Sequence, residues 1–206
     1  MMERSQKIRK YCVYAAYLLL FTTIQVTFPG LFTFYGIRPD LMFVMVVLCA
    51  YMFGFYDGMI FGALTGIIRD YLSSPAITVS EGNVQPAIGL GLLLMVCAAA
   101  FGSAFFTVRV KRNFLIAVLS VIAATVLYKA CGHLIIYIST NIINGTAYNV
   151  SIKGIFLRSV LPQTLLNLAA AVPFYALLKF AGPYSKGINP YLKDERKGGS
   201  DLWLTM

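Results

Sequence analysis

Ionisable side chains are rare within the apolar stretches of this sequence, and three of them could form a polar site. Asp70 ends one apolar run, and Lys129 and His133 lie four residues apart in a later run, on one helix face. Counting along the two helices places Asp70 and Lys129 at similar heights. A charge without a partner is costly in an apolar environment, so we predict that these two form an ion pair. The alternative is that Lys129 extends to a polar interface and Asp70 bonds locally to Arg69.

Further polar residues lie at or near the starts of apolar runs. Arg38 and Asp40 flank a proline, and a proline followed by an acidic residue suits the first turn of a helix. Gln163 and Asn167 share a helix face between two prolines, where amides can bond across helices. The predicted intramembrane polar network comprises Arg38, Asp40, Arg69, Lys129, His133, Arg158, Gln163 and Asn167.

These residues form no recognisable catalytic or cofactor motif. The sequence lacks the H-E-x-x-H, G-x-S-x-G, Walker A and G-x-G-x-x-G patterns. One histidine and eight acidic residues leave little material for acid–base chemistry. Its four cysteines include no C-x-x-C pair, so neither a disulfide framework nor a zinc site is indicated. We therefore expect no enzyme activity, no cofactor and no metal.

A row of glycines recurs at every fourth position. It comprises Gly54, Gly58, Gly62 and Gly66, and Asp70 continues the series. Small residues at this spacing let two helix backbones approach closely in lipid. The row therefore predicts a close-packed helix interface, and the opposing helix can belong to this chain or to a partner.

Composition places these residues in a membrane protein. Of the 206 residues, 59% are hydrophobic and 12% are charged, against about 45–50% and about 25% in soluble domains. Such a chain has far too few charges for a disordered or ordinary water-soluble protein. Six transmembrane helices are predicted from the apolar runs at residues 11–28, 41–56, 58–72, 87–108, 114–139 and 158–181.

The distribution of Lys and Arg indicates how the helices are oriented. Most of these residues fall on one side if the N-terminus is cytoplasmic, as the positive-inside rule requires. The net charge of +9 then reflects topology and contact with membrane lipid rather than nucleic acid. We expect an all-α polytopic helix bundle over residues 1–183 with both termini in the cytoplasm, and a charged cytoplasmic tail over residues 184–206.

Several of these motifs resemble the MreD family of rod-shape-determining membrane proteins of bacteria. In this family an acidic residue often follows the pair that corresponds to Leu161-Pro162, whereas this chain has Gln163 at that position. The matching stretches are Arg38-Pro39-Asp40-Leu41, the glycine row ending in Asp70, residues 127–137, and Arg158-Ser159-Val160-Leu161-Pro162-Gln163 with Asn167.

The resemblance implies a non-enzymatic, multi-pass protein of the bacterial inner (cell) membrane that serves peptidoglycan synthesis during cell elongation. Its implied partners are MreC and, through MreC, the RodA glycosyltransferase with its transpeptidase partner and the MreB filaments. The glycine row and Asp70 would make helix contacts within the bundle or with MreC. The basic loop at residues 109–112 would face the inner leaflet or the filaments.

MreD also looks similar in fold to the six-span substrate-binding subunits of energy-coupling-factor transporters, and this supplies the alternative function. Those subunits use an A-x-x-x-A row in the first span to hold their energising partner. Here Ala15 and Ala16 are followed by bulky residues at 18–21, so the row is absent. A proton-coupled carrier is less favoured, because such carriers contain inverted repeats that this sequence lacks.

Overall fold

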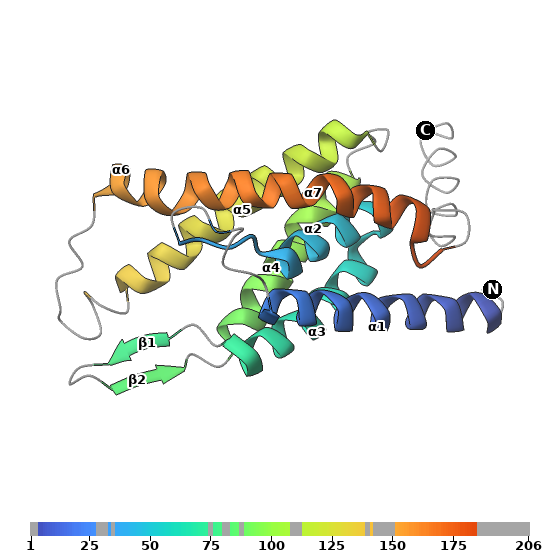
Figure 1. The fold of residues 1–206 in the computed structure, drawn as a ribbon, viewed down its shortest axis with the longest axis horizontal. Coiled ribbons are helices and arrows are strands. Elements are labelled where there is room, and N and C mark those ends of the chain that lie inside the picture. The colour runs from blue at the N-terminus through green and yellow to red at the C-terminus, as the bar shows by residue number, and fades with distance from the viewer. Residues whose placement is uncertain are drawn as a thin grey trace, which may run out of the picture.

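The computed structural model shows a bundle of helices with one short β-hairpin (Figure 1). The residues that it describes are 4–27, 33, 36–73, 76–79, 83–86, 89–107, 113–138, 141 and 151–184. The long helices are α1 (Arg4–Thr27), α2 (Leu41–Phe53), α3 (Phe55–Ser73), α4 (Leu90–Thr107), α5 (Phe114–Tyr137) and α7 (Leu161–Ala181). The short helix α6 (Ile152–Ile155) and a π-helical turn, η3 (Phe156–Val160), lead directly into α7. Each predicted apolar run therefore contains a helix.

Two helical stretches are long and apolar enough to cross a membrane, Phe114–Ile135 and Lys153–Ala181. Only 28% and 17% of their most apolar windows are buried inside the molecule. The core helix of a soluble protein would be mostly buried, whereas most residues of these stretches are exposed or only partly buried.

Helix α2 occupies the centre of the bundle. All 13 of its residues are buried, and it packs against α1, α3, α4, α5 and α7. At 1.5 Å per residue it is only about 20 Å long, which is short for a membrane span of about 30 Å. Other helices enclose it along its whole length.

Glycines allow α3 to pack closely on α2 and α4. A Cβ atom added to Gly58 would lie 2.4 Å from the Cβ of Ala50 on α2, and one at Gly66 would lie 2.5 Å from the Cα of Leu92 on α4. A Cβ at Gly62 would lie 3.0 Å from the carbonyl oxygen of Met95. These three glycines therefore face helices of the same chain.

Gly54, the first glycine of the row, has a different role. It ends α2 with φ at +97°, a left-handed conformation that favours glycine. Helix α3 begins at the next residue. The connection between the two helices is therefore this single residue, three positions before the boundary between the predicted runs 41–56 and 58–72.

A β-hairpin between α3 and α4 was not predicted. Strands β1 (Ala76–Val79) and β2 (Asn83–Pro86) are antiparallel, with Ala76 opposite Pro86 and Val79 opposite Asn83. The all-α prediction omits this element, because strands of four residues are too short to show a clear alternation in sequence.

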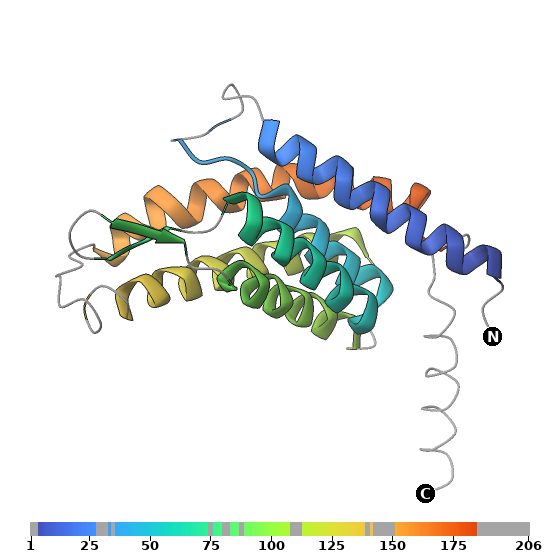
Figure 2. The same cartoon turned by 90° about the horizontal axis from the view of Figure 1, so that it is seen from below.

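The start of α1 and the end of α7 lie at the same end of the bundle, whereas the β-hairpin and α6 lie at the opposite end (Figures 1 and 2). Chain ends on one side are what an even number of crossings requires. The basic loop at 109–112 and the tail beyond residue 184 lie outside the described residues.

Candidate functional site

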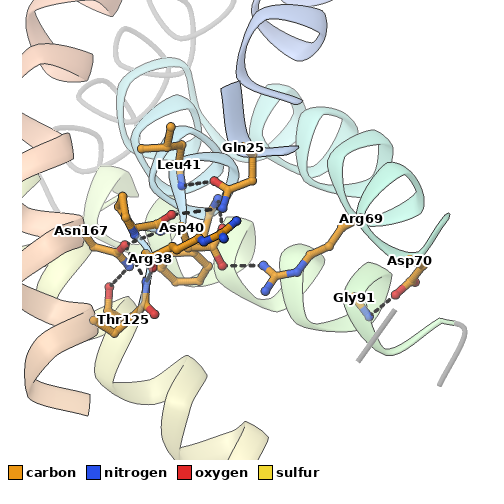
Figure 3. A network of polar contacts seen from close by, with 12 residues as sticks. Gln25, Arg38, Asp40, Leu41, Arg69, Asp70, Gly91, Thr125 and Asn167 are labelled. Atoms are coloured by element: carbon orange, nitrogen blue, oxygen red, sulfur yellow. Dashed lines mark hydrogen bonds and ion pairs between the residues drawn. The ribbon is translucent and has the colours of Figure 1, made fainter. Parts of the chain in front are cut away.

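Most of the predicted polar network gathers around the N-terminus of α2 (Figure 3). Asp40 caps this helix, because its Oδ1 accepts a hydrogen bond from the backbone N–H of Phe43 at 3.1 Å. Its other oxygen, Oδ2, lies 2.6 Å from Nη1 of Arg69 on α3. One carboxylate thus fixes the start of α2 and ties it to α3.

Two amides of α7 extend the network across the bundle. The Oδ1 of Asn167 accepts hydrogen bonds from the backbone N–H of Asp40 at 2.9 Å and from Nε2 of Gln163 at 3.0 Å. Its Nδ2 donates to Oγ1 of Thr125 on α5 at 3.1 Å. Gln163 also donates to the carbonyl oxygen of Arg38 at 3.0 Å. Helices α2, α5 and α7 are therefore joined at one point.

Gln25 of α1 belongs to the same network, although it was not predicted. Its Nε2 donates to the carbonyl oxygen of Pro39 at 3.1 Å, and its Oε1 accepts from the backbone N–H of Leu41 at 2.8 Å. Gln163 and Asn167 were singled out by their spacing of four between two prolines, and Gln25 has no such partner, so only its position inside the predicted run 11–28 could have marked it. A threonine hydroxyl can bond within its own helix, as that of Thr125 does to the carbonyl oxygen of Val121. A threonine in an apolar run therefore does not by itself indicate a contact with another helix.

A polar pocket of about 190 Å³ opens beside this network, and we call it the Asp40 pocket. It is lined by three basic residues, Arg38, Arg69 and Lys129, and by one acidic residue, Asp40. The guanidinium carbon of Arg69 lies 5.4 Å from the centre of the Tyr128 ring, within range of a cation–π contact. The lining is completed by Gln25, Met42, Tyr128 and Gln163.

Asp70 does not form the predicted ion pair with Lys129. It points away from the Asp40 pocket (Figure 3), and its carboxylate accepts hydrogen bonds from the backbone N–H groups of Gly89, Gly91 and Leu92 at 2.9, 2.7 and 3.0 Å. The first turn of a helix leaves such N–H groups without partners, so Asp70 caps α4. Lys129 lines the Asp40 pocket instead, and within the described residues it makes no ion pair.

His133 and Arg158 also lie apart from the network. His133 places Nε2 3.2 Å from Oγ of Ser159, which joins α5 to η3. Arg158 is exposed on η3. Spacing along a helix correctly put His133 on the face of Lys129, but one turn is enough to carry it beyond the pocket.

A second polar cluster, which was not predicted, lies at the other end of α2; we call it the Asp57 cluster. Asp57 stands in the first turn of α3 and is 3% exposed. Its carboxylate lies 2.5 Å from Nζ of Lys10 and accepts hydrogen bonds from the hydroxyls of Tyr14, at 3.1 Å, and Tyr184. The cluster joins α1, α3 and the residues that follow α7.

Chemically, both clusters are suited to joining helices. No group of three or more His, Cys, Asp or Glu side chains that could hold a metal ion occurs in the described part of the chain. No protein-family model, curated protein or solved structure matches this sequence. Function must therefore be inferred from the residues and their geometry.

Proposed function

We propose that this chain is a non-enzymatic membrane scaffold of the MreD type. The proposal rests on the hydrogen bonds made by the residues of the MreD-like motifs. Asp40 and Asp70 cap helices, and Gln163 and Asn167 bond across helices. Polar side chains occupied in this way build a rigid bundle that can hold partners.

A membrane location is supported by an apolar stripe along α3. Tyr56, Ile60, Leu64, Ile67 and Tyr71 are all largely exposed, and their spacing puts them opposite the glycines that face α2 and α4. Apolar side chains pointing outward on successive turns suit contact with lipid or with another membrane helix. Together with the distribution of positive charge, this supports six spans with both termini in the cytoplasm.

The proposed partners are MreC and, through it, RodA with its transpeptidase and MreB, in the bacterial inner membrane. In this proposal the partner surface is an exposed apolar face such as that of α3. The glycine row is less suited to the role, because Gly58, Gly62 and Gly66 already face helices of the same chain.

Co-purification tests the proposal. The tagged full-length protein would be extracted from its native membrane in mild detergent, and the bound proteins would be identified by mass spectrometry. We expect MreC and the peptidoglycan synthases to be recovered. Replacing Leu64 on α3 by Trp should reduce that recovery more than the same change at Leu115, which is exposed on α5. Preparations that contain none of these partners would contradict the proposal.

One observation favours the alternative, a substrate-binding subunit of an energy-coupling-factor-type transporter. The Asp40 pocket is polar and lies at the end of the bundle that we propose to be the outer one. Its volume of about 190 Å³ is nevertheless below the roughly 300–1,000 Å³ of typical small-molecule sites. Recovery of paired ATPases with a coupling membrane subunit in the same co-purification would establish the transporter and exclude the scaffold.

A further inference from the structure

We propose that the Asp40 pocket binds a phosphate group, supplied either by a phospholipid headgroup or by free phosphate. This site goes beyond the scaffold function and does not depend on which proteins the chain binds. It rests on the charge of the pocket, on the position of Lys129 and on the size of the space.

The charge of the pocket is unbalanced. Arg69 and Asp40 form an ion pair at 2.6 Å and neutralise each other. Arg38 and Lys129 line the same space and add two positive charges. Among the residues that the structure describes, no further acidic residue lines it. A concave site with surplus charge of one sign attracts ions of the opposite sign.

Lys129 is the residue that most requires an anion. It is partly buried on α5, and its ammonium group makes no hydrogen bond or ion pair with the residues that the structure describes. Asp40 acts on it electrostatically across the pocket but is already paired with Arg69, and burying part of a cation without a counter-charge of its own is unfavourable. An anion in the pocket would supply that charge and accept hydrogen bonds from the ammonium group.

The size of the pocket suits a small oxyanion. A volume of about 190 Å³ corresponds to roughly six water molecules at about 30 Å³ each. This accommodates one phosphate group with part of its hydration, but not a drug-sized ligand. A phosphate monoester such as the headgroup of phosphatidic acid carries about 1.5 to 2 negative charges near neutral pH, which matches the surplus from Arg38 and Lys129 better than the diester headgroup of other phospholipids. A carboxylate would balance only one of these two cations.

The amides of the lining are already occupied, which leaves recognition to the cations. Gln163 donates to Arg38 and Asn167, and Gln25 bonds the backbone of Pro39 and Leu41. These bonds fix the wall of the pocket. Arginine and lysine side chains both bind phosphate well, arginine as a two-pronged donor and lysine as a point charge.

The test uses the full-length protein in micelles of a maltoside detergent, which carries no phosphate. Wild type is compared with Lys129→Met and with a matched control, Lys153→Met, which alters an exposed lysine near the start of α6. In one arm, inorganic phosphate is titrated against chloride at constant ionic strength. In the other arm, phosphatidic acid is added to the same micelles without free phosphate. The thermal unfolding midpoint is recorded in both arms.

We expect the midpoint of wild type and of Lys153→Met to rise in at least one arm, and Lys129→Met to need about tenfold more ligand for the same rise. A response to phosphatidic acid alone identifies a lipid headgroup as the source, and a response to inorganic phosphate identifies a free anion. If Lys129→Met does not fold, Arg38→Met replaces it. Equal responses by wild type and the folded pocket variant, or no response by wild type in either arm, would overturn the proposal.

Discussion

The two ends of α2 each hold a carboxylate, but they do so in different ways. At its C-terminal end, the Asp57 side chain is 2% exposed and meets one lysine and two tyrosine hydroxyls. At its N-terminal end, the Asp40 side chain is 14% exposed and shares a pocket with three basic residues. The first cluster is closed and balanced in charge, whereas the second is open and has surplus positive charge.

This difference separates two roles for buried polar groups. A closed cluster can only join the helices that contribute to it, so its loss should appear as lost stability. An open cluster can also receive a charged group from outside, so part of its effect should depend on what is bound. The two carboxylates therefore predict different consequences for mutations that look alike in sequence.

The largest effect is expected from Asp57→Asn. Removing one partner of a buried ion pair leaves the other charge uncompensated, and we expect a loss of about 3 kcal/mol in the free energy of unfolding. Asp40→Asn should cost less, about 1–2 kcal/mol, because asparagine can still cap α2 and Arg69 is 23% exposed. Unfolding in mixed micelles measures both variants, and a larger cost at Asp40 would reverse the comparison.

Close backbone packing should matter at both ends of α3. Gly58→Ala and Gly66→Ala would each place a Cβ within 2.5 Å of a neighbouring helix, and we expect each to cost about 1–3 kcal/mol in unfolding free energy. Gly132→Ala on α5 is the matched control, because nothing lies within 4 Å of its added Cβ. It should be neutral or slightly stabilising. Equal effects at all three positions would show that helix propensity, not packing, decides the outcome.

Asn167→Leu tests the fully buried part of the Asp40 network, on α7. This residue is 1% exposed, and its loss leaves the backbone N–H of Asp40 without an acceptor and leaves Gln163 with only the carbonyl oxygen of Arg38. We expect a cost of about 2 kcal/mol. Thr125→Val removes only one partner of Asn167 and should cost about 1 kcal/mol. The same unfolding assay compares them, and a greater loss with Thr125→Val would place the centre of the network on α5.

The smallest effect is expected from Lys129→Met in the absence of phosphate. Because Lys129 has no ion pair among the described residues, removing its charge should leave stability unchanged or raise it by up to about 1 kcal/mol. Lys153→Met provides the control for removing a lysine. A large loss of stability in Lys129→Met alone would mean that this lysine already has a structural partner.

The positions of the helices were predictable, because long apolar runs determine them with little influence from the rest of the chain. Asp40 was also predictable as a residue of the first helical turn, because a proline precedes it. The shared face of Gln163 and Asn167 follows from their spacing, and both amides do bond across helices. These features depend on local sequence.

The remaining contacts depend on how the helices are rotated and packed. An ion pair between Asp70 and Lys129 was predicted because the two residues lie at similar heights along their helices. Height along a helix does not determine the direction in which a side chain points. The Asp57 cluster brings together residues that are 47 and 127 positions apart in the chain. No local pattern marks such contacts, so no site was predicted at Asp57.

The orientation of the bundle in a membrane is tested most directly by labelling from outside the cell. The four free cysteines, Cys12, Cys49, Cys97 and Cys131, would be replaced by alanine, and one cysteine would be added at Lys7 or Lys153, both exposed. A membrane-impermeant maleimide is then applied to intact and to permeabilised bacterial cells. We expect Lys153→Cys to be labelled in intact cells and Lys7→Cys only after permeabilisation. Labelling of both positions from the same side would contradict a bundle that spans the membrane with its two polar clusters at opposite faces.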